Sequence, residues 1–130
     1  MANRNTLTAS NIRYLLVMKE LDKDGNGIRC IDIASALSLT KPSVHNMMST
    51  FRDMGLVSKG AYGVVFFTDT GNKIVLKYRR YYDAVSNLLK CSFPYMNDVR
   101  KATCYLLSEI SEESLEDLSQ RQEATDRNKK

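Results

Sequence analysis

The sequence has few of the residues from which disulfide scaffolds, zinc sites and catalytic centres are built. It contains three cysteines without a CxxC pair and a single histidine, His45. An odd number of scattered cysteines favours a reduced, cytoplasmic protein over a disulfide scaffold or a zinc ribbon. A glycine-rich phosphate loop is missing, and His45 has no paired acid or nucleophile pattern, so we do not expect an enzyme.

Long hydrophobic runs are also missing. No apolar stretch approaches the roughly 18 residues of a membrane span, and the start, MANRNTLTAS, lacks the apolar core of a signal peptide. We therefore expect no membrane association. The 130 residues are 43% hydrophobic and 26% charged, which is typical of one globular domain or of a compact unit with an appended subdomain.

Positive charge is concentrated in the first part of the chain. Residues 1–80 contain 12 Lys/Arg and 6 Asp/Glu, a balance of +6, whereas residues 81–130 contain 7 and 9, a balance of −2. The excess is compatible with a polyanionic partner such as nucleic acid.

The stretch DKDGNG, which begins at Asp22, resembles the opening of an EF-hand calcium loop. The loop fails at its twelfth position, where a bidentate glutamate is required and Ile33 stands instead. Arg29 occupies the eighth position, which is normally apolar. We interpret the stretch as a polar turn whose Gly, Asn and Asp residues tolerate positive φ.

The apolar periodicity predicts helices at about 8–21, 31–37 and 41–54. Thr40 is the expected N-cap of the third helix, and Gly55 closes it. A β-hairpin follows, with glycines in its turn. The remaining predicted elements are a long helix that opens at the TDTG motif and runs to about Lys90, a helix over 99–110, a short helix over 112–118, and a disordered tail at 119–130.

This order of elements is that of a winged helix-turn-helix, so the expected fold class is mainly α with a small β-hairpin, followed by a helical region. On the third helix an apolar side recurs at helical spacing: Val44, Met47, Met48 and Phe51. Its other face is small, polar and mildly cationic, as a helix in the DNA major groove requires. A solvated face, or a winged module that contacts protein rather than DNA, is the alternative.

Candidate DNA contacts follow from this face. Base contacts are expected from Pro42, Ser43 and Asn46, because Asn pairs with adenine while Ser and the Pro ring approach base edges. Contacts that position the protein on phosphates are expected from Thr40, Lys41, His45, Ser49 and Arg52, and from Lys59 and Tyr62 of the wing.

The stretch IDIASALSLTKPSVHNMMSTFRDMGLV, the hairpin, TDTG and the long helix resemble the diphtheria-toxin-repressor family of iron-dependent repressors and manganese-transport regulators. The resemblance covers about residues 8–118 and is most specific at LTKPSV. It implies a homodimeric transcription regulator, in most cases a repressor, that binds a palindromic operator in double-stranded DNA. It also implies Mn(II) or Fe(II) as corepressor. The length is similar to that of members without a third domain.

At the positions where the resemblance places metal ligands, most residues have been replaced: Arg13, Leu16, Tyr82, Ser86, Arg100, Leu107 and Ser108. Cys104 alone matches a ligand, although a cysteine at helical spacing with Ala102 and Leu106 is also typical of a core. A divalent ion needs several N, O or S donors, and the arginines would repel it. We therefore expect no metal at this set, with Cys104 as a weak candidate, and no reactive thiol is indicated.

Arg13 is a candidate substitute for the ion. Its guanidinium is always charged and presents five hydrogen-bond donors. The hydroxyl oxygens of Tyr82 and Ser108 could accept hydrogen bonds from it. The alternative is that Arg13 points to solvent.

The predicted domain boundaries are 1–71 for the DNA-binding domain and 72–118 for a helical dimerisation region. The region carries more apolar residues than one small core absorbs, which predicts a two-fold interface. These residues are Val99, Ala102, Leu106, Ile110, Leu115 and Leu118.

Overall fold

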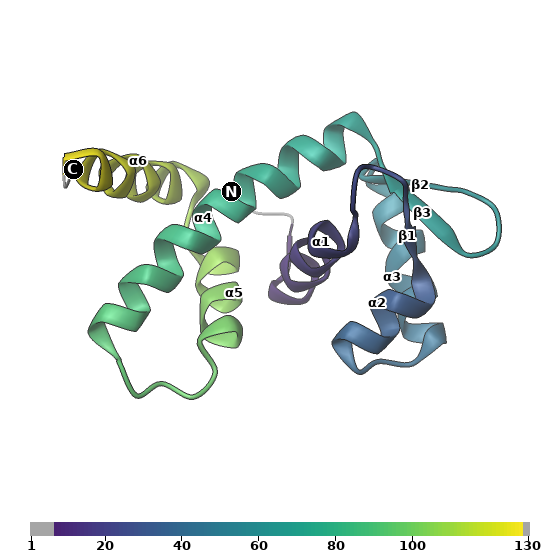
Figure 1. The fold of residues 1–130 in the computed structure, drawn as a ribbon, viewed down its shortest axis with the longest axis horizontal. Helices are drawn as coiled ribbons and strands as arrows, with labels where there is room; N and C mark the ends of the chain where they lie inside the picture. Colours follow the sequence, from purple (N-terminus) through teal and green to yellow (C-terminus); the bar gives the residue numbers. More distant parts are fainter. Residues whose placement is uncertain (1–6, 129–130) are drawn as a thin grey trace. The chain divides into compact units, whose positions relative to one another are not determined.

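The computed structural model describes residues 7–128, which form six helices and three short strands. Figure 1 shows these elements, coloured along the chain from purple to yellow. The elements are α1 (Ala9–Leu21), β1 (Ile28–Arg29), α2 (Cys30–Leu37), α3 (Lys41–Asp53), β2 (Val57–Lys59), β3 (Val64–Phe67), α4 (Asp69–Ser92), α5 (Val99–Glu109) and α6 (Glu112–Asn128). The predicted fold class, mainly α with a small β element in a winged helix-turn-helix, is confirmed.

The chain divides into two compact units, which are described separately. Among the described residues, the winged unit comprises 13–76, and the helical unit comprises 7–12 together with 77–128. Within the described residues, no helix is long and apolar enough to cross a membrane.

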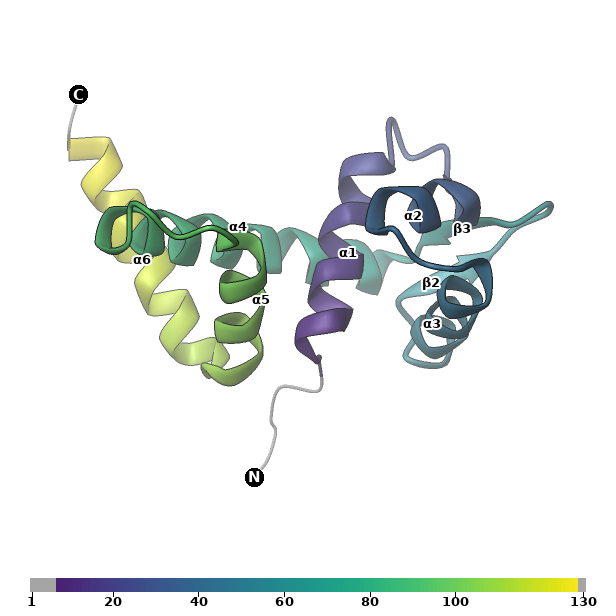
Figure 2. The same cartoon turned by 90° about the horizontal axis from the view of Figure 1, so that it is seen from below.

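In the winged unit, α2 and α3 lie side by side, and the β2–β3 hairpin extends past them (Figures 1 and 2). The turn between the two helices depends on Ser38, which takes the left-handed conformation at φ +56°. Its N–H and that of Leu39 donate to carbonyls in the last turn of α2, including that of Ala34. These bonds satisfy the open end of α2 and direct the chain into α3.

The DKDGNG stretch is a tight turn after α1, as predicted. Asp24, Gly25 and Gly27 have φ values of +63°, +71° and +99°. At Gly27 a Cβ atom would approach Cγ1 of Val64 to 2.7 Å. Gly27 is therefore required both for its backbone conformation and for the close approach of β3.

A third strand was not foreseen. β1 follows the turn and pairs antiparallel with β3, with Ile28 opposite Val65, so that the sheet order is β1-β3-β2. Two residues are too short to give a period-2 signal, which is why sequence reasoning predicted only a hairpin.

The end of α3, the start of the wing and the start of α4 meet at Leu56. Gly55 takes φ +79° after α3, and the N–H of Leu56 donates to the Phe51 carbonyl at 2.9 Å, which completes a Schellman cap. The Leu56 carbonyl then accepts from the N–H of Thr68 at 3.0 Å. The Thr68 hydroxyl donates to the Gly55 carbonyl at 2.6 Å and accepts from the N–H of Gly71 at 3.0 Å, capping α4.

In the helical unit, polar contacts join α6 to α4. The Arg80 guanidinium donates to both carboxylate oxygens of Glu116 at 3.1 Å and also pairs with Glu123. The Tyr81 hydroxyl donates to Glu116 at 3.0 Å. Hydrogen bonds from Arg80, Tyr81 and Gln120 lower the pKa of Glu116 to about 2, so this carboxylate is ionised at neutral pH.

These contacts correct the prediction of a disordered tail at 119–130. Residues 119–128 continue α6, and residues 129 and 130 lie outside the described part. The segment has little to bury, but Ser119 is enclosed, the Gln122 side chain donates to the Ala84 carbonyl at 2.8 Å, and Glu123 binds Arg80. Sequence reasoning counted apolar residues and so missed a helix held by polar contacts.

Replacement of Gly71 tests the junction at Leu56. A Cβ atom at Gly71 would lie 1.9 Å from the Leu56 carbonyl oxygen, which is backbone and cannot rotate away. Gly71→Ala should lower the free energy of unfolding by about 2–4 kcal/mol, measured by urea denaturation. Thr70→Ala, at an exposed neighbour in the same turn, is the control. Equal stability of both variants and the parent would contradict the geometry.

Candidate nucleic-acid interface

The inner side of α3 is fixed in the core of the winged unit. Val44, Met48 and Phe51 have no exposed surface. The ring of Tyr14 from α1 meets that of Phe51 edge to face, with 6.2 Å between the centroids. The predicted apolar side is thus confirmed for these residues, whereas Met47 is only partly buried. A helix anchored in this way has a defined outer face.

That outer face carries the residues predicted to contact DNA. Lys41, Pro42, Ser43, His45, Asn46 and Arg52 are exposed, and Ser49 is partly buried. They belong to one helix face and remain accessible to a partner. The structure brings them together on the outer side of α3.

Thr40 has a structural role at the start of α3. Its hydroxyl oxygen accepts from the N–H of Ser43 at 3.3 Å, and the hydroxyl donates to Oγ of Ser43 at 2.9 Å. The predicted N-cap is therefore confirmed. Ser43 keeps its own hydroxyl hydrogen to donate elsewhere.

The tip of the wing is a strained turn. The N–H of Gly60 donates to the Val64 carbonyl at 2.7 Å, and Tyr62 takes the left-handed conformation at φ +58°. The Tyr62 side chain is 100% exposed. Lys59, at the end of β2, is also exposed. A non-glycine residue rarely adopts this conformation, so the turn presents the Tyr62 ring to the surroundings at some backbone cost.

β1 joins the wing to the helix-turn-helix. Arg29 lies opposite Val64 on β3, and the N–H of Cys30 donates to the Gly63 carbonyl at 2.9 Å. The start of α2 is thereby fixed against the wing tip.

A hollow of about 270 Å³ lies where the start of α2, the first turn of α3 and the wing meet. It is lined by Arg29, Cys30, Ile31, Lys41, His45, Tyr62 and Gly63. Lys41, His45 and Tyr62 were predicted as contact residues, but Arg29 was not. The sequence does not single out Arg29, because DKDGNG resembles a calcium loop and the strand that follows it is only two residues long.

Arg29 is held by Asp32 at the edge of this hollow. Nε donates to Oδ2 at 2.9 Å and Nη2 donates to Oδ1 at 3.1 Å. Both side chains remain largely accessible, at 66% and 41% exposed. The hydrogen bonds and charge of Asp32 raise the pKa of Arg29 further above its ordinary value, so the guanidinium stays charged.

The metal-ligand positions of the sequence resemblance do not fit a divalent ion. Leu16 and Leu107 are buried hydrocarbons, and Arg13 and Arg100 are exposed cations. Cys104 is 2% exposed and lies in the core of the helical unit. Across residues 7–128, no three His, Cys, Asp or Glu side chains gather as a metal site. This donor set lacks the several N, O or S ligands that Mn(II) or Fe(II) requires.

Two serines at those positions already use their hydroxyl hydrogens within the helical unit. Ser86 donates to the Asp83 carbonyl at 3.3 Å, and Ser108 donates to the Tyr105 carbonyl at 2.7 Å. Tyr82 is partly buried. Because Arg13 belongs to the winged unit and Tyr82 and Ser108 to the helical unit, the substitution of Arg13 for an ion stays a prediction.

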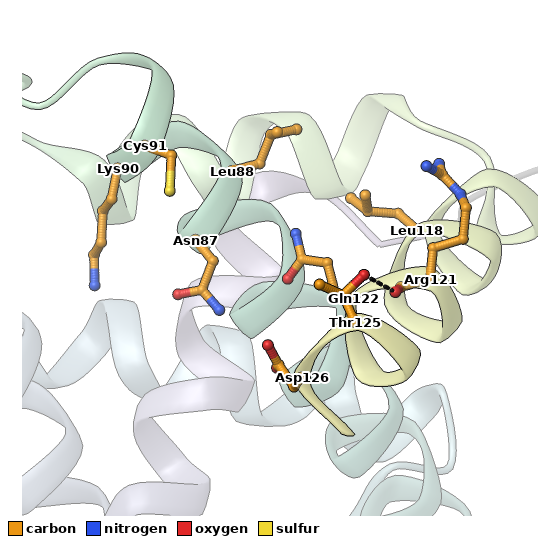
Figure 3. A pocket seen from close by; sticks show the side chains of 9 residues that line it. All are labelled: Asn87, Leu88, Lys90, Cys91, Leu118, Arg121, Gln122, Thr125 and Asp126. Atoms are coloured by element: carbon orange, nitrogen blue, oxygen red, sulfur yellow. Dashed lines mark hydrogen bonds between the residues drawn. The ribbon is translucent and has the colours of Figure 1, made fainter. Parts of the chain in front are cut away.

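A second hollow, of about 510 Å³, lies between α4 and α6 in the helical unit (Figure 3). Leu88 and Leu118 supply apolar surface, and amides and charged groups surround it. The dashed line in Figure 3 marks the Thr125 hydroxyl donating to the Arg121 carbonyl at 3.0 Å. The exposed Cys91, near the end of α4, also lines it.

Comparison with known proteins gives one match to a family model. The IclR helix-turn-helix domain matches residues 12–60, which run from α1 into the wing. No match to the sequence was found among curated proteins. The sequence match is thus limited to the helix-turn-helix segment. The matched IclR model is a different family from the diphtheria-toxin-repressor family that the sequence resembles.

Solved structures match over most of the chain. A hypothetical protein from Sulfolobus solfataricus is 23% identical with a TM-score of 0.61, and the match covers 88% of each chain. The manganese regulator SloR is 21% identical with a TM-score of 0.70, covering 91% of this chain and 54% of the other. IdeR of T. acidophilum is 16% identical with a TM-score of 0.66, covering 93% and 55%.

The chain therefore spans about half the length of these two regulators. At such identities the similarity establishes a shared fold. The neighbours include regulators of the kind that the sequence resembles, which agrees with the order of elements found here.

Proposed function

We propose that the protein is a non-enzymatic, DNA-binding transcription regulator that reads double-stranded DNA with α3 and the wing. The main support is the convergence of the exposed face of α3 and the wing tip on one hollow, which is lined by Arg29, Lys41 and His45. The helix-turn-helix family match and the regulator names of similar structures add to it. Repression is the expected direction of control.

Each part of this surface has a distinct task. Asn46, Ser43 and Pro42 contact base edges and select the sequence. Phosphate contacts come from Thr40, Lys41, His45, Ser49 and Arg52 on α3, and from Lys59 and Tyr62 on the wing. Because Val44, Met48 and Phe51 are fully buried, α3 is held in one orientation and its backbone needs little ordering on binding.

Two variants separate base reading from phosphate binding. Asn46→Ala should weaken binding to the selected operator by about 1–3 kcal/mol and leave random duplex binding almost unchanged. Arg52→Ala should weaken binding to every sequence and reduce the slope of log K against log salt by about 0.9. Fluorescence anisotropy with labelled duplexes measures both, and the operator comes from selection in a random pool.

Arg127→Ala is the matched control, because it removes an exposed cation from α6, outside the proposed interface. If Asn46→Ala and Arg52→Ala bind as the parent does, α3 is not the reading helix. If the parent binds no duplex even at low salt, the module contacts protein instead. The modest charge of α3, with Lys41 and Arg52 as its permanent cations on that face, makes this the second candidate.

We further propose that residues 72–118 mediate a homodimer. Leu115 is enclosed in the core of the helical unit, but five of the predicted apolar residues stay partly exposed: Val99, Ala102, Leu106, Ile110 and Leu118. A two-fold pairing through α5 and α6 covers this surface and places two reading helices about one DNA turn apart, which suits a palindromic operator.

Sedimentation velocity tests the dimer. The parent should sediment as a dimer at micromolar concentration, and Leu106→Glu should give a folded monomer because a carboxylate cannot be buried unpaired. Lys101→Glu, at an exposed position of α5, is the control. A parent that stays monomeric would refute the pairing, and so would a Leu106→Glu variant that stays dimeric.

We also propose that DNA binding does not depend on Mn(II) or Fe(II), because the donor set described above does not fit either ion. EDTA and added Mn(II) should leave operator affinity unchanged. Arg13→Ala should weaken binding while the circular dichroism spectrum is retained, if Arg13 replaces the ion; Arg100→Ala is the control. Purified protein that contains stoichiometric transition metal and releases DNA on chelation would contradict this proposal.

A further inference from the structure

Asp32 lies in an unusual place for an acidic residue, because it forms an ion pair with Arg29 beside the proposed DNA-binding surface. Arg29 lines the hollow beside Lys41 and His45, and its guanidinium is bound at both carboxylate oxygens of Asp32. The surface proposed to bind DNA phosphates thus carries the Asp32 carboxylate, which is hydrogen-bonded to Arg29, one of its cations. Exposed ion pairs contribute little to stability, so stability alone does not account for this arrangement.

The hollow has the chemistry of a phosphate site. Its volume of about 270 Å³ is ample for one phosphate group, and its lining presents Arg29, Lys41 and the imidazole of His45. A guanidinium binds phosphate in the same bidentate manner as it binds carboxylate. Asp32 and a DNA phosphate therefore compete for the same donors of Arg29.

We propose that this hollow receives a backbone phosphate of DNA, and that Asp32 restrains Arg29 and so limits sequence-independent DNA affinity. The inference rests on the proposed function. Paired with Asp32, Arg29 adds no net charge to the interface and releases few counterions from DNA. Freed from Asp32, it neutralises one further phosphate.

A purely structural role for Asp32 predicts no gain in DNA affinity when Asp32 is replaced. Asp32 is the acidic residue in the first turn of α2, where a carboxylate also stabilises the helix through its dipole. If that were its only role, Asp32→Asn would lower stability and leave DNA affinity unchanged or weaker. A gain in affinity is not explained by helix stabilisation.

The test uses the full chain and a random 20-base-pair duplex, titrated by anisotropy between 50 and 200 mM salt. Asp32→Asn should bind about threefold or more tightly at the low-salt end, with a log K against log salt slope steeper by about 0.9. Arg29→Ala should bind more weakly than the parent, because it leaves the Asp32 carboxylate facing the phosphate. The double variant should return to the slope of the parent.

Asp83→Asn is the matched control, because it makes the same charge change at another exposed Arg–Asp pair, with Arg79 on α4. It should leave duplex affinity unchanged. Asp32→Ser provides a second replacement if Asp32→Asn loses its native circular dichroism spectrum, and the same gain is expected.

The outcomes separate this inference from the proposed function. If Asp32→Asn and Asp32→Ser bind no more tightly than the parent while Arg52→Ala still weakens binding, the restraint is wrong and DNA reading stands. If the parent binds no duplex at low salt, the proposed function fails and this inference with it. A titration with inorganic phosphate tests whether the hollow binds a free anion instead of a DNA phosphate. If phosphate shifts the His45 ring resonances, and the salt slope of Asp32→Asn equals that of the parent, the hollow is not a DNA site.

Discussion

The Leu56 carbonyl lies so close to Gly71 that no side chain fits between them, and the winged unit depends on this contact. The same carbonyl accepts from the N–H of Thr68, whose hydroxyl joins the Gly55 carbonyl to the N–H of Gly71. One small cluster therefore fixes the end of α3, the base of the wing and the first turn of α4. Because Val44, Met48 and Phe51 of α3 are fully buried and the helix is capped at both ends, its outer face has a defined direction.

A second set of backbone contacts makes the wing part of the same surface. β1 pairs with β3, and the N–H of Cys30 donates to the Gly63 carbonyl, so the start of α2 is bonded to the wing tip. The hollow lined by Arg29, Lys41, His45 and Tyr62 is a consequence of that pairing. On the proposed function, DNA is recognised by side chains that this fixed backbone carries: phosphate contacts supply affinity, and base contacts supply sequence selectivity.

The sequence predicted the winged fold because its local signals agree with one another. Thr40 caps α3, the glycine after α3 has positive φ, and the apolar period of α3 matches its buried residues. It failed where structure depends on polar contacts between distant residues. α6 continues through residues 119–128 because Arg80 and the Ala84 carbonyl bind its side chains, and no local pattern encodes these partners. Arg29 was missed for another reason: its strand is only two residues long and gives no periodic signal.

The central claim, that α3 and the wing form a DNA-reading surface, is tested most directly by mapping backbone amide resonances while duplex DNA is added at low salt. The account predicts that the largest shift changes fall in residues 40–52 and 59–63 and around Arg29, and that they diminish as salt is raised. Shift changes confined to α5 and α6, or a spectrum that duplex DNA leaves unchanged, would contradict it.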